Sequence, residues 1–268
     1  MKKILTVLLA AACAAGVLSG CGKAQASGDE SLKKVQDKSK FVLGLDDTFE
    51  PMGYRNENNE IVGFDIDVAT EVTSRMGVEL VLQPIDWNAK EQELNSGNID
   101  CIWNGFSITE ERAKALNLTE PYMNNRMVLV VLKDSGYTSQ ADLAGQSIGV
   151  QNGSSAQDTL ENSEFAKSVK EVIGYKGNLD GFMDLEAKGI AAMFLDEVMA
   201  NYYITEKQKD YVVIEDGALA EEEYAIGFRK DDQALRDEVQ KQLKEMKADG
   251  KLAEISTKWF GKDITTVK

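Results

Sequence analysis

Acidic, hydroxyl, amide and aromatic side chains follow the ends of several predicted strands in this chain of 268 residues. In open α/β sheets, ligands bind outside the carboxyl ends of the strands, so these side chains are candidates for one site. The set is Asp46, Phe49, Trp87, Asn104, Gly105, Ser107, Gln151, Ser154, Ser155 and Asp196. Such a mixture of acids, rings and hydroxyls suits a small polar ligand better than a phosphate group or a metal ion.

Arg112 is the candidate cation. It follows Ser107 in a segment that predicts the start of a helix, because Ser107 and Glu110 have capping-box spacing and Thr109 is a competing N-cap. A guanidinium turned back toward the strand ends could hold a carboxylate through two parallel charge-assisted hydrogen bonds. The alternative is a solvated helix arginine paired with a neighbouring acid, and the residues alone leave both open.

The other candidates also have two interpretations each. Residues 152–155 predict a turn into a helix whose free N–H groups favour an anion, or a plain N-cap without a ligand. Asp46 and Asp196 could each hold an ammonium group, or serve as turn and cap residues. Phe49 and Trp87 could enclose an aliphatic stem, or belong to the core.

The composition excludes several kinds of chemistry. The chain has no histidine, which excludes imidazole as a general base, proton shuttle or metal ligand. Its three cysteines form no C-x-x-C pair and are too few for a zinc site made of cysteine alone. With 45 acidic against 30 basic residues, the net charge of −15 argues against nucleic acid as a partner. No P-loop motif is present, and we expect no nucleotide hydrolysis, no cofactor and no metal ion.

The amino terminus has the pattern of a bacterial lipoprotein signal. Two lysines precede the uncharged run 4–17, which is long enough for a signal peptide but too short to span a membrane. Residues 18–21 resemble a lipobox. We therefore predict a signal peptide at 1–20, lipid on Cys21 and a lipidated tether at 21–38, with an ordinary secretory signal as the alternative. The protein would then be extracytoplasmic, in the periplasm or at the cell surface, and would contact the membrane through its lipid only.

Short apolar runs alternate with stretches of helical period from Phe41 onward, which predicts an α/β fold with parallel or mixed sheets. The predicted strands are 41–45, 78–82, 99–103, 127–132, 147–150, 171–173, 191–195, 211–214 and 225–228. The predicted helices are 65–76, 88–95, 156–167, 179–188, 197–206, 233–247 and 252–259. Interruptions at 121–125 and 217–223 fit a chain that crosses twice between two lobes, or simple long loops.

Several motifs favour the two-lobe interpretation. They are Gly-Phe-Asp-Ile-Asp at 63–67, Ser-Ile-Thr-Glu-Glu-Arg at 107–112, Gly-Val-Gln-Asn-Gly-Ser at 149–154 and Asp-Glu at 196–197. In their order, over residues 40–262, the chain resembles the extracytoplasmic solute-binding proteins (family 3) of polar-amino-acid ABC transporters. This group is related to the lysine/arginine/ornithine-, histidine- and glutamine-binding proteins.

The resemblance implies a two-lobed periplasmic-binding-protein type II fold with two crossover strands. Lobe 1 would comprise 39–121 plus 223–268, lobe 2 would comprise 127–217, and the hinge would lie at 122–126 and 218–222. A free L-amino acid would bind between the lobes of a monomer, close them, and be delivered to an ABC permease whose ATPase supplies the energy. A surface receptor that only senses the amino acid, and an enzyme similar to cyclohexadienyl dehydratases, are the alternatives.

The resemblance also implies roles for the residues at the two ends of the ligand. Arg112 would hold the α-carboxylate, helped by Ser107 and by backbone N–H groups near 154–155. Asp196 would hold the α-ammonium group, together with the Gly105 carbonyl and the Ser107 hydroxyl.

The pocket for the ligand side chain is less well defined. By the resemblance, Phe49 and Trp87 would line it and Asp46 would face a distal charge. Gln151 stands where the glutamine-binding pattern has a lysine, and Asn104 where the basic-amino-acid binders have a serine. Because these departures leave a mixed pocket, a sulfur-containing amino acid such as cystine is as defensible a ligand as a basic one.

Overall fold

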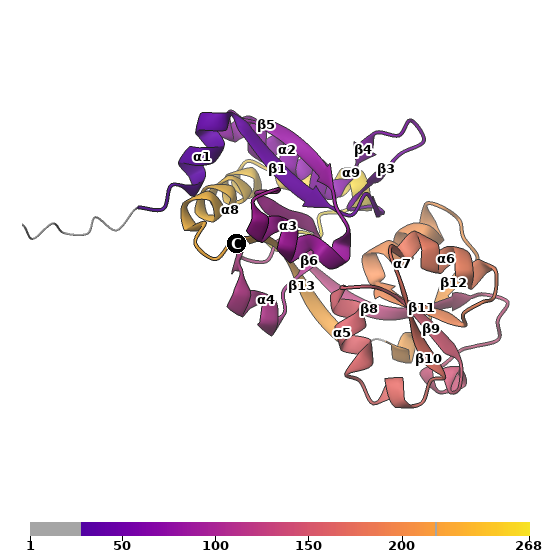
Figure 1. The fold of residues 1–268 in the computed structure, drawn as a ribbon. Helices are drawn as coiled ribbons and strands as arrows, with labels where there is room; N and C mark the ends of the chain where they lie inside the picture. Colours follow the sequence, from indigo (N-terminus) through magenta and orange to yellow (C-terminus); the bar gives the residue numbers. More distant parts are fainter. Residues whose placement is uncertain (1–27, 218) are drawn as a thin grey trace, which may run out of the picture.

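The computed structural model describes residues 28–217 and 219–268, which form two lobes joined by a pair of long strands (Figure 1). This is the α/β architecture that the sequence predicts. The predicted signal peptide at 1–20 and the lipidated Cys21 lie outside the described residues. In the part of the chain that is described, no helix has the length and apolar character needed to cross a membrane.

The elements fall into two groups and a connection. The first lobe contains α1 (Ser31–Lys38), β1 (Lys40–Leu45), β2 (Thr48–Phe49), β3 (Gly53–Arg55), β4 (Ile61–Val62), α2 (Phe64–Met76), β5 (Glu79–Pro84), η1 (Trp87–Ala89), α3 (Lys90–Ser96), β6 (Cys101–Ser107), α4 (Glu110–Ala115), β7 (Asn117–Leu118), α8 (Gln233–Ala248) and α9 (Lys251–Phe260). The second contains η2 (Gln140–Leu143), β9 (Ser147–Gln151), α5 (Ser155–Glu161), η3 (Phe165–Lys167), β10 (Glu171–Tyr175), α6 (Asn178–Glu186), β11 (Ala192–Asp196), α7 (Glu197–Thr205), β12 (Tyr211–Val213) and η4 (Glu215–Gly217). The connecting strands are β8 (Met123–Leu132) and β13 (Ala220–Phe228).

Within the described residues, one mixed ten-stranded sheet runs through both lobes, with the strand order β10-β9-β11-β8-β13-β6-β1-β5 along its main path. β1 pairs in parallel with β5 and β6, and β9 pairs in parallel with β10 and β11. β8 and β13 pair antiparallel at its centre, where Ala220 lies opposite Met127 and Tyr224 opposite Met123. The chain therefore crosses between the lobes on two strands that are hydrogen-bonded to each other.

The two segments predicted as interruptions overlap the beginnings of these strands. β8 begins at Met123 and β13 at Ala220, whereas the sequence predicted strands from Met127 and Ala225. The prediction was wrong at these ends because their residues are polar. Buried and more exposed positions alternate along both segments, as in a strand that is covered on one face only. The lobe boundaries at 39–121, 127–217 and 223–268 stay a prediction.

The predicted tether at 21–38 is wrong over its last eight residues, which form helix α1. Val35 is buried in the core, and the N–H of Leu235 in α8 donates to the Ser31 hydroxyl at 3.0 Å. The Lys38 ammonium forms an ion pair with Asp100 at 2.7 Å. A helix with few apolar residues is thus held by packing and polar contacts from distant parts of the chain, which its own composition does not reveal.

The other predicted strands and helices correspond to observed elements, with one division, whereas the short strands β2, β3, β4 and β7 were not predicted. The helix predicted at 156–167 is two elements, α5 and η3, because the chain turns at Asn162 and the Ser163 hydroxyl accepts from the N–H of Ala166 at 3.1 Å.

Four strand ends carry candidate residues. Asp46 follows β1, and Ser107, Gln151 and Asp196 end β6, β9 and β11.

Candidate ligand-binding site

The predicted site residues all line one cavity between the lobes. Its lining is Asp46, Phe49, Trp87, Asn104, Gly105, Ser107, Arg112, Gln151, Ser154, Ser155 and Asp196. These residues are up to 150 positions apart, and the carboxyl ends of β1, β6, β9 and β11 bring them together. The rule that ligands bind at strand ends therefore located a real cavity, and ligand binding by each residue stays a prediction.

The cavity is narrow, with a free volume of about 20 Å³, which is room for one water molecule. Residues of the two lobes contact each other at the cavity wall and beside it. The Gln151 amide donates to the Asp46 carboxylate at 2.6 Å, and the Lys90 ammonium donates to the Gly153 carbonyl at 2.7 Å. An amino acid can enter only when these contacts separate.

Arg112 is turned into the cavity instead of toward solvent, with 7% of its surface exposed. Its Nη1 donates to the Ser107 carbonyl at 2.8 Å, and its guanidinium lies 4.3 Å from the centre of the Phe106 ring. Helix α4 is capped by Thr109, whose hydroxyl accepts from the Arg112 N–H at 3.1 Å, and not by Ser107. Burial lowers the pKa of Arg112, while nearby carboxylates including that of Glu91 oppose the shift. An anionic ligand group would supply the same compensation.

Ser154 is the N-cap of helix α5, on the opposite wall. Its hydroxyl accepts from the N–H of Gln157 at 3.1 Å and donates to the Gln151 carbonyl at 2.8 Å. This is the capping geometry that the sequence allowed, and it places the Ser154 and Ser155 side chains at the cavity wall.

Asp196 is a buried acid with neutral partners. Its carboxylate accepts from the Asn125 amide at 2.8 Å and from the Tyr224 hydroxyl. Among the ion pairs of residues 28–217 and 219–268, none includes Asp196. Burial first, and then the negative charge of Glu222, raises the pKa of Asp196 to about 7. A cationic ligand group beside this carboxylate would favour its ionised form.

Asp46 is a second buried acid held by neutral donors. One carboxylate oxygen accepts from the Thr48 N–H at 2.9 Å and from its hydroxyl at 2.7 Å, and the other accepts from Gln151. Asn104 accepts from the Asp46 N–H at 3.1 Å and so fixes the backbone there. Burial raises the pKa of Asp46. The two contacts with Thr48 fit the turn role that the sequence allowed, and the contact of Asp46 with a ligand ammonium group stays a prediction.

The Gly-Phe-Asp-Ile-Asp motif supports the floor of the cavity. The Asp65 carboxylate is fully buried and accepts from the Gly105 N–H at 2.8 Å and from the Tyr122 hydroxyl at 3.0 Å. Gly105 has a φ of +56°, and a Cβ there would lie 2.6 Å from Cε1 of Phe49. Gly105 thus allows the Phe49 ring to approach the strand. Trp87 meets Phe106 edge to face, with ring centres 6.1 Å apart.

Three residues at the site were not predicted from the sequence. Asn125 and Tyr224 hydrogen-bond Asp196, and Glu222 accepts from the hydroxyls of Ser107 and Ser155. All three belong to the connecting strands β8 and β13. The sequence gives no local signal for Glu222, because it stands in a run of glutamates from 221 to 223.

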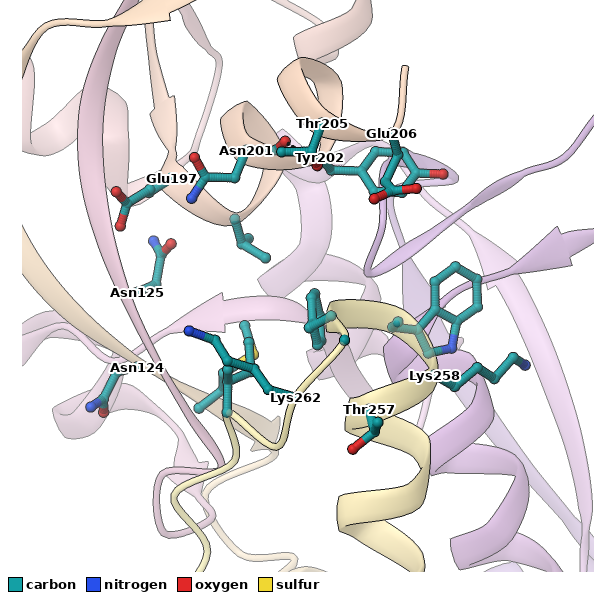
Figure 2. Close-up of a pocket in the computed structure, with 16 residues that line it drawn as sticks. Asn124, Asn125, Glu197, Asn201, Tyr202, Thr205, Glu206, Thr257, Lys258 and Lys262 are labelled. Carbon is teal, nitrogen blue, oxygen red and sulfur yellow. Dashed lines mark hydrogen bonds between the residues drawn. The ribbon is translucent and has the colours of Figure 1, made fainter. Parts of the chain in front are cut away.

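A larger groove of about 660 Å³ lies between α7 and the end of α9 (Figure 2). Polar side chains from both lobes face it, among them Glu197 and Asn201 from α7, Lys258 from α9 and Lys262 just beyond α9. None of the predicted site residues lines it. Its size suits a small-molecule site, but the buried acids and Arg112 converge in the narrow cavity, which is the better candidate.

In the described part of the chain, no group of three or more Cys, Asp or Glu side chains has a metal-binding arrangement. Cys101 there is a free thiol buried in the core.

Residues 41–262 match the model of the bacterial extracellular solute-binding proteins, family 3. The chain belongs to this family. It is 33% identical over 266 residues to the arginine-binding extracellular protein ArtP of Bacillus subtilis, covering 97% of this chain and 98% of ArtP. It is 28% identical to the L-cystine-binding protein TcyJ of Escherichia coli, covering 87% of each.

A solved structure agrees with this family membership and with the two-lobed fold. An ABC uptake transporter substrate-binding protein from Streptococcus pneumoniae, with bound histidine, matches with a TM-score of 0.86 and 39% identity. The match covers 90% of this chain and 99% of that one. The family resemblance found in the motifs is thereby confirmed.

Proposed function

We propose that this solute-binding protein binds a free L-α-amino acid in the narrow cavity and delivers it to the permease of an ABC importer. The observation that carries the proposal is that Arg112 and Asp196 are both buried and line the same cavity. Each has an electrostatic effect on the pKa of the other. A guanidinium and a carboxylate that face the same small space match the carboxylate and the ammonium group that every α-amino acid carries.

The side chain of the ligand is proposed to be basic. Asp46 is buried, its partners are neutral, and it lies in the same cavity as Asp196. A distal guanidinium, ammonium or imidazolium group would compensate the cost of burying this carboxylate. The similarity to an arginine-binding relative and to a structure with bound histidine supports this class. The cystine-binding relative makes cystine the alternative ligand.

Ligand binding is proposed to shift the protein toward a closed arrangement that docks on the permease. The strands β8 and β13, which connect the lobes, are the proposed hinge. We further propose that the protein acts as a monomer, is held on the membrane by lipid on Cys21, and binds its ligand without chemical turnover.

A thermal-shift screen tests the proposal. The probes are the twenty amino acids, cystine and ornithine, because a ligand that binds only the folded state raises Tm. We expect basic amino acids to raise Tm and the bound amino acid to be recovered unchanged after prolonged incubation. No shift by any probe at millimolar concentration would contradict the proposal, and conversion of the ligand would identify an enzyme.

A further inference from the structure

Glu222 lies on the connecting strand β13 with its carboxylate against the cavity wall. Its Oε2 accepts from the Ser107 hydroxyl at 2.5 Å and from the Ser155 hydroxyl at 3.3 Å. Ser107 ends β6 in the first lobe and Ser155 begins α5 in the second, and both line the cavity. One carboxylate on a connecting strand therefore contacts a site residue of each lobe.

The neighbours of Glu222 on the same strand face the other way. Glu221 and Glu223 are exposed, whereas Glu222 is half-buried. None of the ion pairs in the described ranges includes Glu222, and the Arg112 guanidinium pairs instead with Glu91 at 3.9 Å. The Glu222 carboxylate faces the charges of Arg112 and Asp196. It also lines a hollow at the surface, together with Arg126 and Glu197. The carboxylate is thus held mainly by neutral hydroxyls beside another buried acid.

We propose that Glu222 is a positioning residue, which orients the Ser107 hydroxyl so that its oxygen accepts from the α-ammonium group of a bound amino acid. This inference rests on the proposed function. A serine hydroxyl has one hydrogen and two acceptor lone pairs. When its hydrogen goes to Glu222, the hydroxyl can only accept from the ligand. The site then selects a donor at this position and rejects a carboxylate, so the ligand is held in one direction.

The opposite role is that Glu222 imitates the ligand carboxylate and competes with it. The geometry argues against competition, because the Arg112 guanidinium forms no ion pair with Glu222 and remains available for the ligand. The two roles predict opposite results for a neutral residue at position 222. Loss of a positioning carboxylate weakens binding, and loss of a competing carboxylate tightens it.

The decisive variant is Glu222→Met, which keeps the length of the side chain and removes both acceptor oxygens and the charge. Glu223→Met on the exposed face of the same strand is the matched control. The probes are L-arginine, L-histidine and L-cystine, each compared with its analogue that lacks the α-amino group: 5-guanidinopentanoic acid, 3-(imidazol-4-yl)propanoic acid and 3,3′-dithiodipropanoic acid. Calorimetry gives the amino-acid affinities, and competition against the amino acid gives those of the analogues.

We expect Glu222→Met to weaken binding of the amino acid by roughly tenfold or more, because the Ser107 hydroxyl is no longer held as an acceptor for the charged ammonium group. The affinity for the desamino analogue should change by less than about threefold, and Glu223→Met should leave both affinities unchanged. An unchanged or tighter amino-acid affinity, or an equal loss for both ligands, would overturn the inference. If no amino acid of the thermal-shift screen binds the wild-type protein, the proposed function fails before the variant is tested.

Ser107→Ala keeps the inference testable if Glu222→Met folds poorly, and a double-mutant cycle tests the coupling of the two residues when both variants fold. Ser107→Ala removes the oriented hydroxyl directly, so it should weaken binding of the amino acid and leave the affinity for the desamino analogue unchanged. In the Ser107→Ala background, a second substitution of Glu222 should weaken binding much less than it does alone, because the two side chains act through one contact. Additive losses would contradict a positioning role.

Discussion

Ligand affinity should depend on pH through Asp196. Burial raises the pKa of this carboxyl to about 7 in the free protein. The α-ammonium group of the ligand favours the ionised form, so below pH 7 binding must release a proton from Asp196. The titration of Asp196 should therefore leave the affinity nearly constant above pH 8 and lower it by up to tenfold per pH unit below 7, roughly fiftyfold between pH 7 and pH 5. The raised pKa values of Asp46 and Glu222 act in the same direction.

Calorimetric titrations at pH 8, 7, 6 and 5 measure this dependence. Repeating each titration in buffers of different ionisation enthalpy counts the protons released on binding. Asp196→Asn is the control, and it should bind more weakly at pH 8 and lose the part of the pH dependence that Asp196 supplies. A dissociation constant that is the same at pH 8 and pH 5, or binding at pH 5 without proton release, would refute the assignment.

Three further predictions concern stability. Gly105→Ala should lower the free energy of unfolding by at least ~1 kcal/mol more than Gly136→Ala. Both glycines have positive φ, but only at Gly105 would the added Cβ lie against a ring. Urea unfolding of both variants checks this. Val35→Ala should destabilise the protein by about 1–2 kcal/mol if α1 belongs to the fold, and by nothing if that segment is a tether. Burial raises the folded-state pKa of Asp65 and Asp196 to about 7, against about 3.9 in an unfolded chain. Between these pH values the folded state therefore binds more protons than the unfolded state, so these two groups should make Tm of the free protein fall from pH 5 to pH 7. An unchanged or rising Tm would contradict this. Asp65→Asn is the control, because it removes one of the two titrating groups.

The sequence predicted the parts of the molecule that local patterns determine. The apolar run at 127–132 belongs to a strand with its residues buried on both faces, and the helix predicted at 65–76 is α2 to within one residue. The site followed from one rule, that ligands bind at the carboxyl ends of strands. Because the rule concerns sheet topology, it predicts that Asp46 and Asp196 lie close together although they are far apart in the sequence. In the structure, both line the same cavity.

What the sequence missed depends on contacts between distant residues. Ser107 has the spacing of a helix cap, but its hydroxyl donates to Glu222, 115 residues further along the chain, and Thr109 is the cap instead. Helix α1 is held by α8 at the other end of the sequence. Glu222 itself stands among other glutamates, and only the direction of the strand separates it from its exposed neighbours.

The central claim is that Arg112 and Asp196 hold the two ends of a free amino acid. The most direct measurement is a parallel calorimetric titration of the wild-type protein and Arg112→Ala with L-arginine, repeated with L-histidine and L-cystine. We predict that the wild-type protein binds at least one of these amino acids specifically. Arg112→Ala should weaken that binding at least ~30-fold, because the buried ligand carboxylate loses its charged partner. Equal affinity of the two proteins for that amino acid would contradict it.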